Sequence, residues 1–176
     1  MFVRGHGAFQ RTTVEGQQVM TAIAGPGELY GITSISGTMS TVDLFALHNS
    51  EVAVWDGEDF RQLAAHDPKL ALDVIDRLAS FLAMLNEKVD GFLHQDARRR
   101  VIRILARHRD LFFSEPPILS RPYLPALVGT SREMTGSVLR RLEREGTIAR
   151  VGRTGLRLHD PAGLELDDAS ALRRTG

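Results

Sequence analysis

The stretch VGTSREMTGSVLRRLEREG, at residues 128–146, decides how the rest of the chain is interpreted. Gly129 permits the left-handed turn at which two helices can meet at a steep angle, and Ser131 is a favourable N-cap for the next helix. We predict the turn and second helix of a helix-turn-helix. Its first helix should span residues 121–128, with Ser120 as N-cap and Pro122 in the opening turn. The apolar stripe expected on the second helix consists of Met134, Val138, Leu139 and Leu142.

The other side chains of the second helix, and the residues after it, are typical of a helix that reads DNA. Such a helix lies in the major groove, with its N-terminal side chains at base edges and its later arginines at phosphates. Gly146 closes the helix, and two alternating runs at 147–151 and 155–159 predict a hairpin wing. A basic amphipathic helix after a glycine also arises without this function, but here the cap, turn, basic face and hairpin agree. The phosphate contacts that we expect are Ser131, Arg140, Arg141, Arg144 and Arg153.

The charges are divided between the two halves of the chain, although the whole chain is neutral with 22 basic and 22 acidic residues. Residues 1–95 carry six Lys or Arg against twelve Asp or Glu, whereas residues 96–176 carry sixteen arginines against ten acids. Positive charge is what binds the phosphate backbone. We therefore expect only the second half to contact a polyanion.

The composition excludes several other classes of protein. The chain of 176 residues has no cysteine, which excludes a disulfide framework, a thiol sensor and cysteine-ligated zinc or iron–sulfur sites. No apolar run reaches membrane-spanning length and the opening residues lack a signal-peptide core, so we expect a cytoplasmic protein without a membrane partner. The six histidines have no metal-ligand spacing, and no nucleophile lies in a catalytic arrangement. We expect no metal site, no catalytic residues and no enzyme.

Residues 2–54 have the pattern of a small all-β unit. Seven glycines punctuate this segment, and Glu15-Gly16 fits a hairpin turn between the first two of its strand-like runs. Trp55 and Phe60 are expected in the core. The predicted strands are 7–13, 18–24, 41–47 and 51–55.

Helix signals begin at Asp56, where acidic residues suit a helix N-terminus without any catalytic role. A short helix over 58–65 is followed by a second start at Asp67-Pro68 and a long helix to about residue 93. Apolar residues recur along this helix in alternating steps of four and three, the spacing of a two-stranded coiled coil. The spacing favours a homodimer over a helix that only packs on its own β unit. After Ala71, the predicted dimer interface consists of Ile75, Leu78, Leu82, Leu85, Val89 and Phe92.

A further helix is predicted from Asp96 until the run Glu115-Pro116-Pro117 ends it. This helix precedes the predicted helix-turn-helix, so its apolar side supplies the rest of that domain's core. The residues expected there are Val101, Ile104, Leu105 and Leu111.

Four stretches together resemble the cyclic AMP receptor protein and FNR (CRP/FNR) family of bacterial transcription regulators: PGELYG, DARRRVIRIL, VGTSRE and GSVLRRLEREG. The resemblance covers nearly the whole chain, and the reader motif is its most specific part. It implies an α+β fold with a partial β-roll of the cyclic-nucleotide-binding type (1–66), a dimerisation helix (67–94) and a C-terminal winged helix-turn-helix domain (95–176). The implied partners are double-stranded DNA, a second copy of the chain and RNA polymerase.

By the same resemblance, Arg132 and Glu133 match the family's main base-contacting positions. Arginine suits the O6 and N7 atoms of guanine, and glutamate suits the amine of cytosine. Ser137 stands where many members carry another base-contacting arginine, which alters the expected half-site. The predicted base contacts are Arg132, Glu133, Gly136 and Ser137.

The sensor segment departs from the family. Members that bind cyclic AMP hold its ribose and phosphate with a glutamate just after a glycine and with an Arg-Ser pair. Here Gly31 is followed by Ile32, residues 33–42 contain no basic side chain, and Glu28 fits a turn better than a ribose ligand. Because a buried cyclic phosphate without a cationic partner is strongly disfavoured, we predict a regulator that does not respond to cyclic AMP.

Strands that normally precede this segment in the family are absent from the sequence. A misassigned start, a shortened chain or a degenerate sensor would each explain this, and a roll without these strands must expose an edge or borrow a partner. Two alternative functions stay open. One is a ligand- or haem-sensing module with conditional DNA binding, for which the sequence selects no cofactor. The other is a truncated interaction protein that antagonises a full-length relative.

Overall fold

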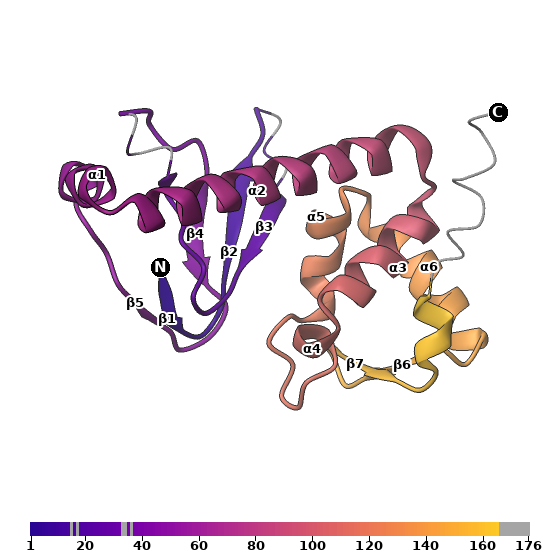
Figure 1. Cartoon of the computed structure of the whole chain (residues 1–176). Helices are drawn as coiled ribbons and strands as arrows, with labels where there is room; N and C mark the ends of the chain where they lie inside the picture. The colour runs from indigo at the N-terminus through magenta and orange to yellow at the C-terminus, as the bar shows by residue number, and fades with distance from the viewer. Residues whose placement is uncertain (15, 17, 33–34, 36, 166–176) are drawn as a thin grey trace. The chain divides into compact units, whose positions relative to one another are not determined.

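The structure, a computed structural model, describes residues 1–165 apart from 15, 17, 33, 34 and 36. The chain divides into two compact units, Met1–Leu93 and His94–Gly176, and each is described by itself. Figure 1 shows strands β1–β5 and helices α1 and α2 in the first unit, followed by the helices and hairpin of the second. This order of strands and helices confirms the predicted α+β class.

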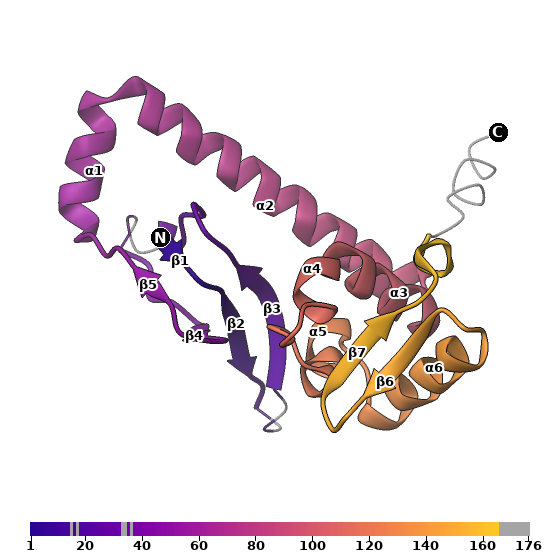
Figure 2. The ribbon, with the colours of Figure 1, turned by 90° about the horizontal axis from the view of Figure 1, so that it is seen from below.

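The β part of the first unit consists of two small antiparallel assemblies (Figure 2). One is a sheet with the order β3-β2-β4, and in the other β1 pairs with β5. Gly7 of β2 lies opposite both Ala24 and Ala46, so β2 is the central strand. A Cβ atom at Gly7 would come within 2.5 Å of the Phe2 ring, which explains the need for glycine there. The strands are β1 (Phe2–Arg4), β2 (Gly7–Thr12), β3 (Gln18–Ala24), β4 (Asp43–Ala46) and β5 (Glu51–Val52).

Three of the four predicted strands correspond to β2, β3 and β4, and β1 was not predicted. Gly16 has the expected left-handed conformation, with φ of 77°, whereas Glu15 of the predicted turn lies outside the described residues. The predicted strand at 51–55 is wrong after Val52, because the chain leaves the sheet and Asp56 starts a helix. Trp55 is consequently 45% exposed rather than in the core, while Phe60 is buried as predicted.

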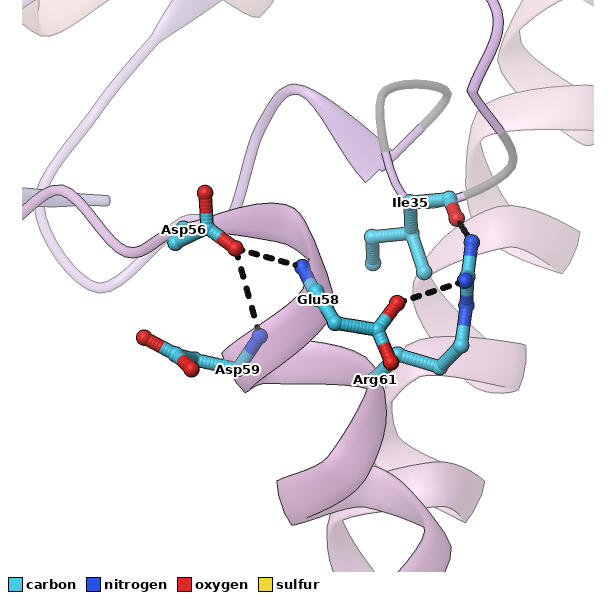
Figure 3. A network of polar contacts seen from close by, with 5 residues as sticks. All are labelled: Ile35, Asp56, Glu58, Asp59 and Arg61. Carbon is cyan, nitrogen blue, oxygen red and sulfur yellow. Dashed lines mark hydrogen bonds and ion pairs between the residues drawn. The ribbon is translucent and has the colours of Figure 1, made fainter.

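The helices α1 (Gly57–His66) and α2 (Pro68–His94) begin at the predicted caps. One carboxylate oxygen of Asp56 accepts hydrogen bonds from the backbone N–H groups of Glu58 and Asp59, at 2.8 and 3.4 Å (Figure 3). Asp67 caps α2 in the same way through Lys69, at 3.0 Å. Each cap satisfies N–H groups that have no partner within the helix. Across the described ranges of the chain, no helix is long and apolar enough to span a membrane.

One side of α2 packs on the strands of its own unit. The Lys88 ammonium donates to the carbonyl oxygens of Met20 and Thr21 in β3, at 2.9 and 3.4 Å, and burial lowers its pKa. The Arg77 guanidinium donates to the carbonyl of Gly27, at 2.8 Å. The buried and half-buried positions on this side are Leu70, Val74, Met84, Lys88 and Gly91.

The second unit is a helical core closed by a hairpin. Its first helix, α3, packs against α5 and α6, and the Asp96 side chain caps α3 through the N–H of Arg99, at 2.8 Å. Burial of each large apolar side chain contributes roughly 1.5–3 kcal/mol, and this unit has many of them. The elements are α3 (Ala97–Arg107), α4 (Arg109–Phe112), η2 (Arg121–Tyr123), α5 (Leu124–Val128), α6 (Arg132–Arg144), β6 (Ile148–Val151), β7 (Gly155–Leu158) and η3 (Pro161–Leu164).

The predicted core of this unit is partly wrong. Val101 and Leu105 are fully buried as predicted, but Ile104 and Leu111 are only half-buried. Ile102 and Phe112 are buried in their place. The predicted helix is interrupted at His108, so α4 starts anew and presents a different side to the core.

Candidate nucleic-acid interface

The turn between α5 and α6 has the geometry of a helix-turn-helix. Gly129 has φ of 68° and ψ of 48°, and its N–H donates to the carbonyl of Pro125, at 2.9 Å. The Ser131 hydroxyl then accepts from the N–H of Met134, at 3.0 Å, and starts α6. The predicted first helix is a turn of 3₁₀ helix followed by α5, and Ser120 stands at its start without a side-chain capping bond.

Helix α6 buries a stripe that differs from the prediction at one position. Val138, Leu139 and Leu142 are buried as predicted, but Met134 is 49% exposed and Thr135 is buried instead. The Thr135 hydroxyl donates to the carbonyl of Ser131, at 3.0 Å, so its polar group is satisfied inside the helix. Met134 is therefore part of the outer surface.

The outer face of α6 is polar and basic. Arg132, Glu133, Ser137, Arg140 and Arg144 are all exposed. Within the part of the chain that the structure describes, Arg132, Arg140 and Arg144 form no ion pair. A Cβ atom at Gly136 would lie 3.5 Å from Arg140 Nη1, so the arginine side chain passes over this glycine. The structure thus brings the four predicted base-contacting residues to the first half of one exposed helix surface.

The C-terminal end of α6 leads directly into the wing. Gly146 has φ of 77°, its N–H donates to the carbonyl of Glu143, and the N–H of Thr147 donates to that of Leu142. These two bonds form the helix ending that glycine favours. The strands β6 and β7 then pair antiparallel from Ile148 to Leu158, which confirms the predicted hairpin.

An ion pair braces the wing against α6. The guanidinium of Arg150 in β6 lies 2.6 Å from the Glu143 carboxylate, and its backbone N–H donates to the same group at 3.3 Å. These hydrogen bonds lower the pKa of Glu143 and raise that of Arg150. The turn of the wing is attached to the start of η2, because Arg121 donates from its backbone to Thr154, at 2.8 Å, and from its side chain to the carbonyl of Arg153, at 2.6 Å. The predicted phosphate contact Arg153 is therefore exposed on a fixed turn.

The exposed side chain of Arg141, a predicted phosphate contact, is paired with a carboxylate of its own unit. Its Nε atom lies 2.9 Å from Glu145, and the second oxygen of the same carboxylate lies 2.7 Å from the guanidinium of Arg98 in α3. Sequence reasoning missed this cluster and the brace at Arg150. The i, i+4 spacing of Arg141 and Glu145 could have predicted their ion pair from the sequence. The pairs Arg98–Glu145 and Arg150–Glu143 join different elements and depend on the tertiary fold.

The predicted dimer interface is an exposed apolar strip on α2. Leu82 is 61% exposed, and Ile75, Leu78, Val89 and Phe92 are also exposed, whereas Leu85 is half-buried. This strip is adjacent to the side of α2 that carries Lys88 and packs on the strands. The first unit therefore leaves a continuous row of apolar side chains on its surface.

The first unit also has an apolar hollow of about 360 Å³, beside β1, β2 and β4. Asp56 carries the only charged side chain among its described lining residues, which include Phe9, Leu29, Ile32 and Leu44. Neither Arg4 nor Arg11 lines it, and Arg4 is paired with Glu51, at 2.7 Å. Residues 33, 34 and 36, which belong to the segment without basic side chains at 33–42, lie outside the described residues.

The polar groups near this hollow have structural partners. The Glu28 carboxylate accepts from the N–H of Gly25, at 2.7 Å, and from the hydroxyl of Tyr30, which supports its interpretation as a turn residue. Burial, together with this bond to Glu28, raises the pKa of Tyr30. Arg61 of α1 pairs with Glu58, at 2.8 Å, and donates to the carbonyl of Ile35 (Figure 3).

Comparison with known proteins gives two family matches. A family model described as the Crp-like helix-turn-helix domain matches residues 76–166, more than half of the chain, and one described as the cyclic nucleotide-binding domain matches residues 1–67. The chain belongs to the CRP/FNR family. It is therefore a DNA-binding transcription regulator and not an enzyme.

Individual relatives agree with this membership. The Cyclic AMP receptor protein of Thermus thermophilus is 30% identical over 161 residues, which are 88% of this chain and 72% of that protein. The structure of the c-di-GMP responsive global regulator CLP from Xanthomonas campestris is similar with a TM-score of 0.73 and 25% identity, over 90% of this chain and 82% of that one. A transcriptional regulator of the CRP/FNR family, also from Thermus thermophilus, has a TM-score of 0.76 and 23% identity, over 93% and 83% of the two chains, and supports the fold alone.

Proposed function

We propose that this CRP/FNR regulator is a homodimer that reads a specific, two-fold symmetric DNA site through α6. The observation that carries the proposal is the exposed, basic face of α6. The helix itself is capped at Ser131, and an ion pair between Glu143 and Arg150 fixes the wing to it. Such a rigid, basic helix suits the major groove. Arg132, Glu133, Gly136 and Ser137 are the proposed base contacts, with phosphates bound by the later arginines and the wing.

Dimerisation through α2 follows from the apolar strip after Ala71. A heptad-spaced row of apolar residues exposed on a monomer costs free energy in water, and a second copy of the same helix covers it symmetrically. A two-fold dimer also places two reading helices one turn of DNA apart. The dimer would act in the cytoplasm and change transcription by contacting RNA polymerase.

The first unit does not suit a cyclic nucleotide. A cyclic phosphate needs a cation at short range. The only charged side chain in the described lining of the hollow is the carboxylate of Asp56, and the N-terminal ammonium of Met1 donates to the carbonyl of Ala53, at 2.9 Å. We propose that DNA binding does not depend on cyclic AMP. The apolar lining favours, as a second candidate function, a sensor for an apolar small molecule.

The direct test is Arg132→Ala, with binding measured by fluorescence anisotropy on a selected DNA site and on its single-base variants. We expect a loss of about 1–3 kcal/mol and a relaxed preference at one base pair per half-site, because a bidentate contact with guanine is removed. Arg4→Ala, which removes the same charge from the first unit, should change little. An equal loss on every sequence would make Arg132 a phosphate contact and contradict its proposed role.

A further inference from the structure

Glu145 at the C-cap of α6 holds two guanidinium groups from two helices. Its carboxylate oxygens lie 2.9 Å from Arg141 of α6 and 2.7 Å from Arg98 of α3. Hydrogen bonds from these two arginines lower the pKa of Glu145. Both oxygens of one carboxylate are thus occupied by the donors that arginine otherwise offers to a phosphate.

This cluster differs from the brace at Glu143. Arg150 is bound to Glu143 through its backbone as well as its side chain, so that pair fixes the wing to α6. The Arg141 side chain is 61% exposed and bonds Glu145 one turn further along the same helix. No second element depends on the Arg141 pair for its position, so this guanidinium is free to exchange its partner.

We propose that Glu145 competes with DNA phosphates for Arg141, and thereby lowers the part of the DNA affinity that comes from phosphate contacts. The proposal rests on the proposed function. Non-specific affinity comes almost entirely from phosphate neutralisation, so each arginine that a carboxylate occupies lowers it directly. The proposed base contacts Arg132 and Glu133 are not touched by Glu145. Glu145 therefore tunes phosphate-dependent affinity by withholding the charge of Arg141.

The size of the effect follows from the exposure of the pair. Exposed ion pairs are weak, so the competition should change the affinity for random DNA by about three- to tenfold, rather than abolish binding. Each released arginine that reaches a phosphate steepens the slope of log K against log salt concentration by about 0.9.

The experiment compares Glu145→Gln with Asp110→Asn in the full chain. Asp110, exposed in α4, forms no ion pair among the described residues, so its substitution makes the same change in net charge without releasing an arginine. Binding to a random-sequence duplex is measured by anisotropy at several salt concentrations, and circular dichroism checks that both variants are folded. We expect Glu145→Gln alone to bind about three- to tenfold more tightly, with a slope steeper by about one.

A second comparison assigns the effect to the arginine. In an Arg141→Gln background, Glu145→Gln should gain at most the contact of Arg98, with a smaller change in slope. Equal effects of Glu145→Gln and Asp110→Asn, or weaker binding by Glu145→Gln, would overturn the role of Glu145. A wild-type chain that binds no DNA would instead overturn the proposed function itself.

Discussion

The two units differ in how many of their apolar side chains they bury. Of the nineteen buried apolar residues that the structure describes, fourteen lie in the DNA-binding unit and only five in the first unit. Of the nineteen large apolar residues that are exposed, seventeen lie in the first unit, and only Met134 and Val151 in the second. The DNA-binding unit covers its own apolar surface, whereas the first unit leaves much of its own exposed.

This difference assigns different roles to the two units: one fixes the geometry of its own helix α6, and the other presents an apolar surface. The geometry of α6, the proposed reading helix, is set within one unit by Gly129, the Ser131 cap and the wing brace at Glu143. Exposed apolar strips of this extent mark interaction sites in soluble proteins. The strip on α2 has the heptad spacing of a two-stranded coiled coil, so under the proposed dimerisation a second copy would cover it and stabilise the first unit.

The largest effect is expected from Leu82→Glu, which tests whether α2 is completed by a second copy. Two glutamates facing each other across the axis should convert the dimer to a monomer and, through loss of the paired half-sites, reduce specific DNA affinity on the order of 100-fold. Light scattering and anisotropy measure the two effects. Leu72→Glu is the matched control, because Leu72 is equally exposed, at 61%, but lies off the strip. A monomeric wild-type chain at micromolar concentration would contradict the proposal.

A smaller effect, on the free energy of unfolding, is expected in the DNA-binding unit, where Ser120 and Ser131 each precede a helix. Ser131→Ala removes a capping bond of 3.0 Å and should lower the free energy of unfolding by about 1 kcal/mol. Ser120→Ala should lower it far less, because Ser120 makes no capping bond. Urea unfolding of the full chain, followed by far-ultraviolet circular dichroism, gives both values. Equal losses would show that the cap does not distinguish these positions.

No effect is expected from cyclic AMP at millimolar concentration. A ligand present at 100 times its Kd stabilises the folded state by about 2.7 kcal/mol, which raises the Tm by several degrees. Trp55, the single tryptophan, reports on the first unit in a thermal melt followed by fluorescence. A saturable rise in Tm with cyclic AMP would mean that arginines from elsewhere complete the site.

The sequence predicted those features that depend on local chemistry. The helix starts at Asp56, Asp67, Asp96 and Ser131 were predicted correctly because a cap needs only its own following turn. The glycine turn and the hairpin wing were equally local. These features were enough to place the predicted base contacts on one exposed helix.

The errors have tertiary causes. Met134 was preferred to Thr135 as a core residue because of its hydrophobicity, but the Thr135 hydroxyl is satisfied by Ser131 and can be buried. Trp55 was predicted in the core, but its own unit covers it only in part, and it is 45% exposed. The bonds of Arg98 and Arg150 depend on which helix and strand lie beside α6, which no local pattern contains.

The central claim is that this chain reads a two-fold symmetric DNA site through α6. The most direct measurement is selection of bound sequences from a pool of random duplexes by the wild-type protein, without any added ligand. We expect enrichment of two inverted half-sites about one helical turn apart, bound at least about a thousand times more tightly than random DNA. A pool that shows no enrichment, or only a single unsymmetric site, would contradict it.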